Sequence, residues 1–252
     1  MIYIVLGMHK SGTTLVSKIL HESGIPMGHF NEAVGYDEGN KYERLETHDL
    51  NIEMLGYDYD EFSLNILKVI QDPAEVKPET LRKIKEALEN ADRQYPDWGF
   101  KDPRTCLTYP VWKSLIPRRK LVIIFRNPVE LWLHYKPKHF LKSIQAFFIC
   151  WKALQSWYVH NFEILKILQA GGEEVFVMEY GNLMMDDRCF EGLCRFTGRK
   201  LRDSRKTGLY RNKGKSRDLR YQGMLVLQKF LFKRDVRGLY QKLKKYQTGA
   251  RP

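Results

Sequence analysis

Met1-Ile-Tyr-Ile-Val-Leu6 is followed by Gly7-Met-His-Lys-Ser-Gly-Thr-Thr14 and by Leu15 to Ser23, and this stretch decides the fold of the 252-residue chain. Residues 2–6 are a short apolar run of the kind found in buried central strands. Two glycines then enclose four residues, and an amphipathic, helix-forming sequence follows directly. A strand, a glycine-bounded loop and a helix N-terminus together direct backbone N–H groups at a phosphate. The stretch therefore predicts an anion-binding loop at the start of an α/β fold.

The position of the loop lysine separates this chain from nucleotide kinases. Their loop reads G-x-x-x-x-G-K-[ST], and here the glycine spacing fits but Thr13 stands where that pattern has lysine. The lysine lies inside the loop instead, as Lys10. A tight β–α turn without a ligand is the alternative interpretation of the glycines alone.

The loop His9-Lys-Ser-Gly-Thr-Thr14 resembles the 5′-phosphosulfate loop of sulfotransferases that use 3′-phosphoadenosine-5′-phosphosulfate (PAPS). In that family the loop lysine lies near the oxygen that bridges phosphate and sulfate, and hydroxyls and backbone amides hold the 5′-phosphate. The resemblance implies a catalytic charge on Lys10. It implies that the donor is bound by His9, Lys10, Ser11, Gly12, Thr13 and Thr14.

Trp98-Gly-Phe-Lys-Asp-Pro-Arg104 reads as a second buried strand that ends at Pro103. Ligands in open α/β sheets gather at the carboxyl ends of strands, so Lys101, Asp102 and Arg104 are expected near the site. The stretch resembles the K-D-P-R strand end of the same family. Lys101 is a candidate helper of Lys10. Asp102 is a candidate base, or else the partner of Arg104 or Lys101 in a salt bridge.

The clearest predicted strand, Lys120 to Phe125, runs into Arg126-Asn-Pro128. This segment resembles the family's 3′-phosphate motif R-N-P-x-x-x-x-x-S. Arg126 matches the arginine that grips the 3′-phosphate, for which a planar, permanently charged fork is well suited. His134 stands where the family has serine, and a histidine can still donate a hydrogen bond to phosphate.

The base that activates the acceptor is sought in the polar segment after the first helix. Gly35-Tyr-Asp-Glu38 resembles a family segment that carries an acceptor-activating carboxylate in several relatives, and Glu38 matches it. Glu38 could instead favour the first turn of the next helix, which is predicted over Lys41 to Leu55. The ranking of candidate bases is Glu38, then Asp102, then His48.

Positive charge is concentrated at the end of the chain. The formal net charge is +12, but residues 198–252 contain 18 Lys and Arg against three Asp, which leaves residues 1–197 at −3. Such an end suggests an anionic partner. In relatives, a basic loop at the position of Tyr210 to Arg217 closes over the donor. This resemblance implies that Arg211, Lys213 and Gly214 bind the donor.

Apolar residues recur between the lysines and arginines of residues 219–246, which predicts one or two basic amphipathic helices. They could pack on the domain, which is the preferred interpretation, or lie on an anionic membrane surface. Further predicted elements are a surface helix over Pro78 to Ala91, a long helix over His139 to Gln169, and a strand over Glu174 to Met178.

The expected architecture is a single α/β domain over residues 1–217, with a mostly parallel, P-loop-like sheet flanked by helices, and a basic helical extension over residues 218–252. The resemblance implies an enzyme that moves a sulfuryl group from PAPS to a hydroxyl acceptor. Its product is 3′-phosphoadenosine-5′-phosphate (PAP). The four cysteines show no metal spacing and indicate free thiols in a reducing compartment, so we expect a cytoplasmic protein, with an anionic membrane surface as a peripheral partner of the basic end. No metal and no nucleic-acid partner are expected. The alternatives are a nucleoside-phosphate kinase and a non-catalytic protein that binds anions or nucleic acid.

Overall fold

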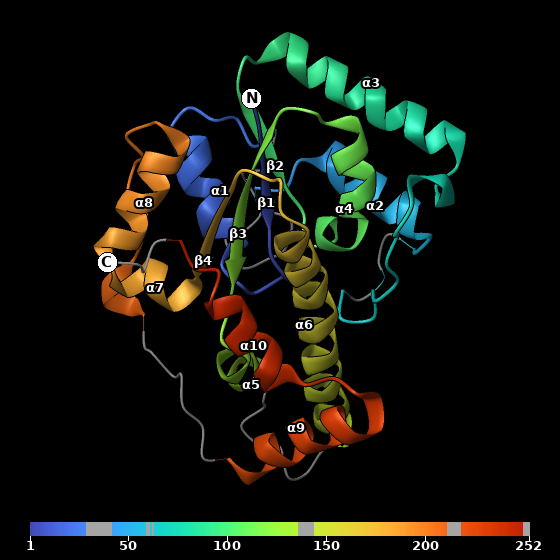
Figure 1. Ribbon diagram of the computed structural model, residues 1–252, viewed down its shortest axis with the longest axis vertical. Helices are drawn as coiled ribbons and strands as arrows, with labels where there is room; N and C mark the ends of the chain where they lie inside the picture. The colour runs from blue at the N-terminus through green and yellow to red at the C-terminus, as the bar shows by residue number, and fades with distance from the viewer. Residues whose placement is uncertain (29–41, 59–60, 62, 136–143, 211–217, 249–252) are drawn as a thin grey trace.

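The computed structural model describes residues 1–28, 42–58, 61, 63–135, 144–210 and 218–248. At its centre lies a sheet of four parallel strands in the order β2-β1-β3-β4 (Figure 1). The strands are β1 (Ile2–Leu6), β2 (Trp98–Lys101), β3 (Arg119–Phe125) and β4 (Val175–Glu179). Ile2 of β1 aligns with Trp98 on one side and with Arg119 on the other. The expected parallel α/β sheet is confirmed.

Helices cover both faces of the sheet, because its strands are apolar on both sides. Tyr3 and Val5 face one layer, while Ile4 and Leu6 face the other. The first layer contains α1 (Thr13–Glu22), α7 (Tyr180–Met185) and α8 (Asp187–Thr197). The second contains α2 (Leu45–Leu55), α3 (Pro78–Gln94), α4 (Thr105–Leu115), α5 (Pro128–Tyr135) and α6 (Ile144–Ala170). The described connections include the short 3₁₀ turns η1 (Pro73–Glu75) and η3 (Thr207–Leu209).

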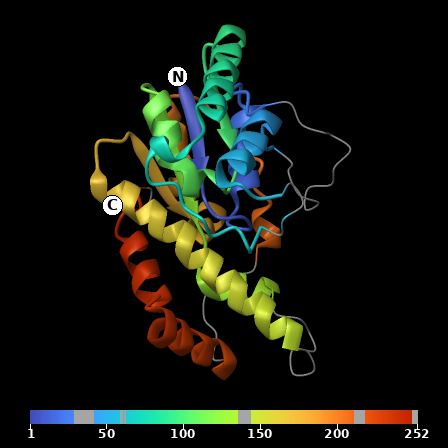
Figure 2. The ribbon, with the colours of Figure 1, turned by 90° about the vertical axis from the view of Figure 1, so that its right-hand side faces the viewer.

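The C-terminal part forms two helices, α9 (Leu219–Phe232) and α10 (Val236–Lys244). α10 packs along α6, and α9 lies at the end of the molecule opposite α3 (Figures 1 and 2). The chain then returns to the sheet, where the backbone N–H of Thr248 donates to the Val177 carbonyl at 3.0 Å. None of the helices in the described part of the chain is long and apolar enough to cross a membrane.

Helix boundaries differ from the sequence expectation where local signals are weak. The helix expected from Lys41 begins at Leu45, after Arg44 as the N-cap residue. α4 was not predicted, because Pro110 lies inside it and proline usually interrupts helices. α3 extends three residues past Ala91, to Gln94. The four cysteines are free thiols.

Candidate functional site

A pocket of about 690 Å³ opens at the carboxyl end of the sheet. Residues that follow each of the four strands line it: Lys10 after β1, Pro103 after β2, Arg126 after β3 and Tyr180 after β4. Pockets of a few hundred to about 1,000 Å³ at this edge of a parallel sheet are typical ligand sites. The topology therefore brings the sequence-predicted segments to one place.

The glycine loop leaves the start of α1 open toward this pocket. Gly12 is the N-cap residue, with φ of 96°, and no side chain caps the helix. A Cβ on Gly12 would lie 2.3 Å from the Tyr180 ring, so both the conformation and the space require glycine. The Ser11 hydroxyl is buried and bonds to no described residue. The uncapped N–H groups of α1 fit an anion at this helix terminus, whereas Ser11 is not among the residues that line the pocket.

Lys10 and Arg126 join the two predicted phosphate segments. Nη1 of Arg126 donates to the Lys10 carbonyl oxygen at 2.9 Å, although the two residues are 116 positions apart. Lys10 adopts φ of 62°, and both side chains line the pocket. Among the described residues, no hydrogen bond or ion pair engages the Lys10 ammonium. A charge on a fixed loop is thus available to a ligand.

The guanidinium of Arg126 is oriented by two further contacts. Its Nε donates to Oε2 of Glu130 at 2.8 Å, and its carbon lies 4.6 Å from the centre of the Tyr180 ring. The other carboxylate oxygen of Glu130 accepts a hydrogen bond from the Tyr210 hydroxyl at 2.6 Å. Glu130 therefore fixes the direction of Arg126. Glu130 lies four positions after Arg126, and this spacing could have predicted their contact from the sequence.

Lys101 is buried and paired with a carboxylate that the sequence analysis did not select. Its Nζ lies 2.5 Å from Oε1 of Glu43, and the side chains are 2% and 8% exposed. Oε2 of Glu43 is buried and has no partner among the described residues, although Glu43 lines the pocket. An apolar strand that ends in lysine requires a nearby anion, and this was the signal that could have indicated Glu43.

Asp102 is fully buried, and both of its oxygens contact Arg104. Nη1 of Arg104 donates to them at 3.0 and 2.8 Å, and the Arg104 backbone N–H donates to Oδ1 at 2.7 Å. Asp102 also precedes α4 and does not line the pocket. Of the two roles considered for Asp102, this geometry favours the salt bridge with Arg104.

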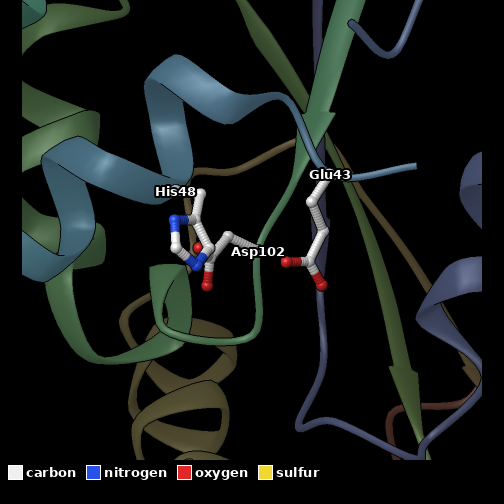
Figure 3. Close-up of side chains that lie close together, drawn as sticks. All are labelled: Glu43, His48 and Asp102. Atoms are coloured by element: carbon white, nitrogen blue, oxygen red, sulfur yellow. The ribbon is translucent and has the colours of Figure 1, made fainter. Parts of the chain in front are cut away.

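Glu43, His48 and Asp102 each offer a ligand atom, and these atoms lie within 4.8 Å of one another (Figure 3). Such a group could hold a cation, but each carboxylate already has a basic partner: Lys101 on Glu43 and Arg104 on Asp102. His48 is buried, and its Nδ1 lies 2.9 Å from Oδ1 of Asp49. Because each carboxylate is already paired with a cation, the donor set fits a metal ion poorly.

Two neutral imidazoles form one wall of the pocket. Burial, with neighbouring His160, lowers the pKa of His9 to about 3, and both ring nitrogens of His9 lack partners in the described chain. Burial also lowers the pKa of His160 to about 4. Nδ1 of His160 lies 2.8 Å from the Ser156 carbonyl, which can only accept, so this nitrogen carries the proton. His134 is exposed at the pocket rim.

Several sequence-predicted residues cannot be placed in this site. Glu38 and the basic-loop residues Arg211, Lys213 and Gly214 lie outside the described residues. Thr13 and Thr14 lie in the pocket at the start of α1, as do His9 and Gly12. Tyr180 and His160 were not predicted from the sequence, because their approach to the pocket depends on segments far away in the chain.

No family model matches the sequence, and no curated protein matches it. Among solved structures, a sulfotransferase from Alicyclobacillus acidocaldarius is 16% identical, with a TM-score of 0.52 over 94% of this chain and 98% of that chain. The sulfotransferase domain of the Synechococcus PCC 7002 olefin synthase is also 16% identical, with a TM-score of 0.49 over 99% and 89%. The likeness to the Alicyclobacillus acidocaldarius structure shows that the chain has a sulfotransferase fold.

Proposed function

We propose that this chain transfers a sulfuryl group from PAPS to a hydroxyl acceptor. The observation that carries the proposal is the contact between Arg126 and the Lys10 carbonyl, which joins the two predicted phosphate segments at a single pocket. A donor with phosphates at both its 5′ and 3′ positions would use both segments at once. A nucleotide without a 3′-phosphate would use only the glycine loop.

Different groups of the pocket suit the two phosphates of the donor. The open N-terminus of α1 suits the 5′-phosphate, and Ser11 stays a prediction for the same role. Arg126 suits the 3′-phosphate, because Glu130 holds its Nε and the Lys10 carbonyl holds its Nη1, which leaves Nη2 for a ligand in the pocket that this side chain lines. His134 at the rim is a further donor contact. Arg211, Lys213 and Gly214 stay predictions for the same role.

When bound, the donor supplies the sulfuryl group. In the transfer, the acceptor oxygen forms a bond to sulfur, the bond from sulfur to the bridging oxygen breaks, and PAP leaves with that electron pair. The Lys10 ammonium stabilises the negative charge that grows on the bridging oxygen. The acceptor hydroxyl loses its proton in the same step, so a base must reach it.

Glu43 is the described carboxylate best placed to take that proton. It lines the pocket, its Oε1 is held by Lys101, and its Oε2 has no partner among the described residues. Asp102 is less suitable, because Arg104 engages both of its oxygens and Asp102 does not line the pocket. Glu38 keeps its place as a candidate, since it lies outside the described residues.

Calorimetry with PAP and with ADP tests the proposal without knowledge of the acceptor. PAP should bind about tenfold to a hundredfold more tightly than ADP, because a charge-assisted contact to Arg126 is worth roughly 1.5–3 kcal/mol. Arg126→Gln should remove this preference, and Arg126→Lys should restore only part of it, since lysine lacks the planar fork. The matched control is Arg82→Gln on the exposed face of α3, which should leave the preference unchanged.

Three outcomes would contradict the proposal. Equal affinity for PAP and ADP would show that no 3′-phosphate site exists. A requirement for magnesium would favour a nucleoside-phosphate kinase. Tight binding of an oligonucleotide with no preference for PAP would favour a non-catalytic anion-binding protein.

A further inference from the structure

The helix α9 is apolar on two opposite faces, and only one of them is covered. Tyr221, Met224, Leu225 and Gln228 are buried against the rest of the domain. The opposite face carries a stripe at helical spacing, formed by Leu219, Val226, Leu227, Phe230 and Leu231, and these side chains are 39–85% exposed. An exposed apolar stripe of this length needs an explanation beyond packing.

Further exposed apolar side chains lie on the first turns of α6. They are Phe147, Phe148 and Ile149. The Trp151 ring connects the two helices, since its centre lies 6.4 Å from that of Phe147 and 5.1 Å from that of Phe232. We refer to the α9 stripe with Phe147, Phe148, Ile149, Trp151 and Phe232 as the apolar tip. Figures 1 and 2 show α9 and one end of the long helix α6 at the end of the molecule opposite α3.

The charges around the apolar tip have one dominant sign. Residues 218–248 contain eight Lys and Arg and only two Asp. Asp218 and Asp235 both have basic partners, Arg220 at 3.1 Å and Lys229 at 3.4 Å. Lys233, Arg237 and Lys242 are exposed next to the tip or on the helix that follows it. Exposed apolar and aromatic side chains flanked by cations are complementary to an anionic lipid surface.

We propose that the apolar tip docks the protein on an anionic membrane surface, with the stripe in the interfacial layer and the basic residues at the lipid headgroups. Interfacial binding is favoured over insertion, because no described helix has the properties of a membrane span. β3 points toward the end of the molecule that carries α9, so the docked protein would have its pocket on the membrane side of the sheet (Figure 1). The docking does not depend on the identity of the donor.

Vesicle sedimentation with the whole chain and no nucleotide tests this proposal. The protein should bind vesicles of phosphatidylcholine with about a third phosphatidylglycerol, and should bind phosphatidylcholine alone at least tenfold more weakly. Phe230→Ser with Leu231→Ser should reduce the binding at least tenfold. Lys233→Gln with Arg237→Gln should reduce it about tenfold or more, and high salt should weaken it. The matched controls are Met185→Ser, an exposed apolar residue on α7, and Arg82→Gln with Lys83→Gln on α3.

Tryptophan fluorescence supplies a second readout, because the other four tryptophans are buried and only Trp151 is partly exposed. Brominated lipids should therefore quench Trp151 on binding. Binding to neutral and anionic vesicles alike, or binding that the tip variants leave unchanged, would overturn the proposal. So would a stable dimer in solution that Phe230→Ser dissociates and that shows no vesicle binding, because the tip would then be a contact between copies of the chain.

Discussion

Removal of either charge in the pair of Lys101 and Glu43 should destabilise the fold strongly. The two charged atoms lie 2.5 Å apart and the side chains are almost completely buried. With an effective dielectric constant of about 20, Coulomb's law gives an attraction on the order of 6 kcal/mol, and desolvation of the two groups offsets much of it. A single substitution loses the attraction and leaves the other charge buried alone, so Glu43→Gln or Lys101→Met should each cost about 3–5 kcal/mol.

The double variant distinguishes the interaction energy of the pair from the separate contributions of Lys101 and Glu43. Glu43→Gln with Lys101→Met removes both charges, so the free energy of unfolding should recover to within about 2 kcal/mol of the parent. Urea unfolding of the four proteins measures the coupling. The matched control is the exposed pair of Lys83 and Glu53, whose atoms lie 3.1 Å apart and whose coupling should not exceed about 1 kcal/mol.

Additive effects at the buried pair, or single substitutions no more costly than those at the surface pair, would refute this reasoning. The same variants test the role of Glu43 as the base. If Glu43 takes the acceptor proton, the double variant should regain stability but not turnover, which should stay about 10²–10⁴-fold below that of the parent. Full turnover in the double variant would remove Glu43 from this role, and Glu38→Gln would then be decisive.

Two further predictions concern single residues of the pocket. Lys10→Ala should lower the rate of PAP release from PAPS about a hundredfold or more, with little effect on PAP affinity, because the Lys10 charge acts mainly on the leaving oxygen. The matched control is Lys18→Ala on α1. A loss of PAP affinity with an unchanged rate would contradict the mechanism. His160 should make stability fall as the pH is lowered, because its folded pKa of about 4 lies below the ordinary 6.5. Only the unfolded chain takes up this proton between those values, so the free energy of unfolding should fall by about 1.4 kcal/mol per pH unit from pH 6.5 toward pH 4. His160→Gln should remove this part of the slope in urea unfolding, and equal slopes in parent and variant would show that the imidazole is not held neutral.

The sequence predicts the parts of this molecule that short-range rules determine. The glycine loop is one of them, since Gly12 is required both by its positive φ and by the approach of Tyr180. The four strands are another, because runs apolar on both faces suit only a covered parallel sheet. The helix α4 escaped prediction, because tertiary packing overrides the local effect of Pro110.

The missed parts of the site depend on contacts between distant segments. Glu43 is 58 residues away from Lys101, and Tyr210 is 80 residues away from Glu130. No periodicity links such pairs, although a buried lysine at a strand end implies an anionic partner somewhere in the chain. The sequence thus indicates that a partner must exist, and the fold decides which residue it is.

The distribution of charge suggests why a strongly basic chain can still be selective for its nucleotide. Within the pocket, Arg126 is balanced by Glu130, Lys101 by Glu43 and Arg104 by Asp102. Lys10 has no such counter-charge among the described residues, and it lies beside the open N-terminus of α1. Among the described residues, a surplus of basic residues lies outside the pocket in residues 218–248, which contain eight Lys and Arg against two Asp. An anion in the pocket is therefore selected by the positions of a few oriented groups. The basic end instead attracts anionic surfaces through its net charge. Salt screens this long-range attraction more readily than it screens the contacts within the pocket. Nucleotide affinity should accordingly depend less on salt than vesicle binding does, because the two use different parts of the charge distribution.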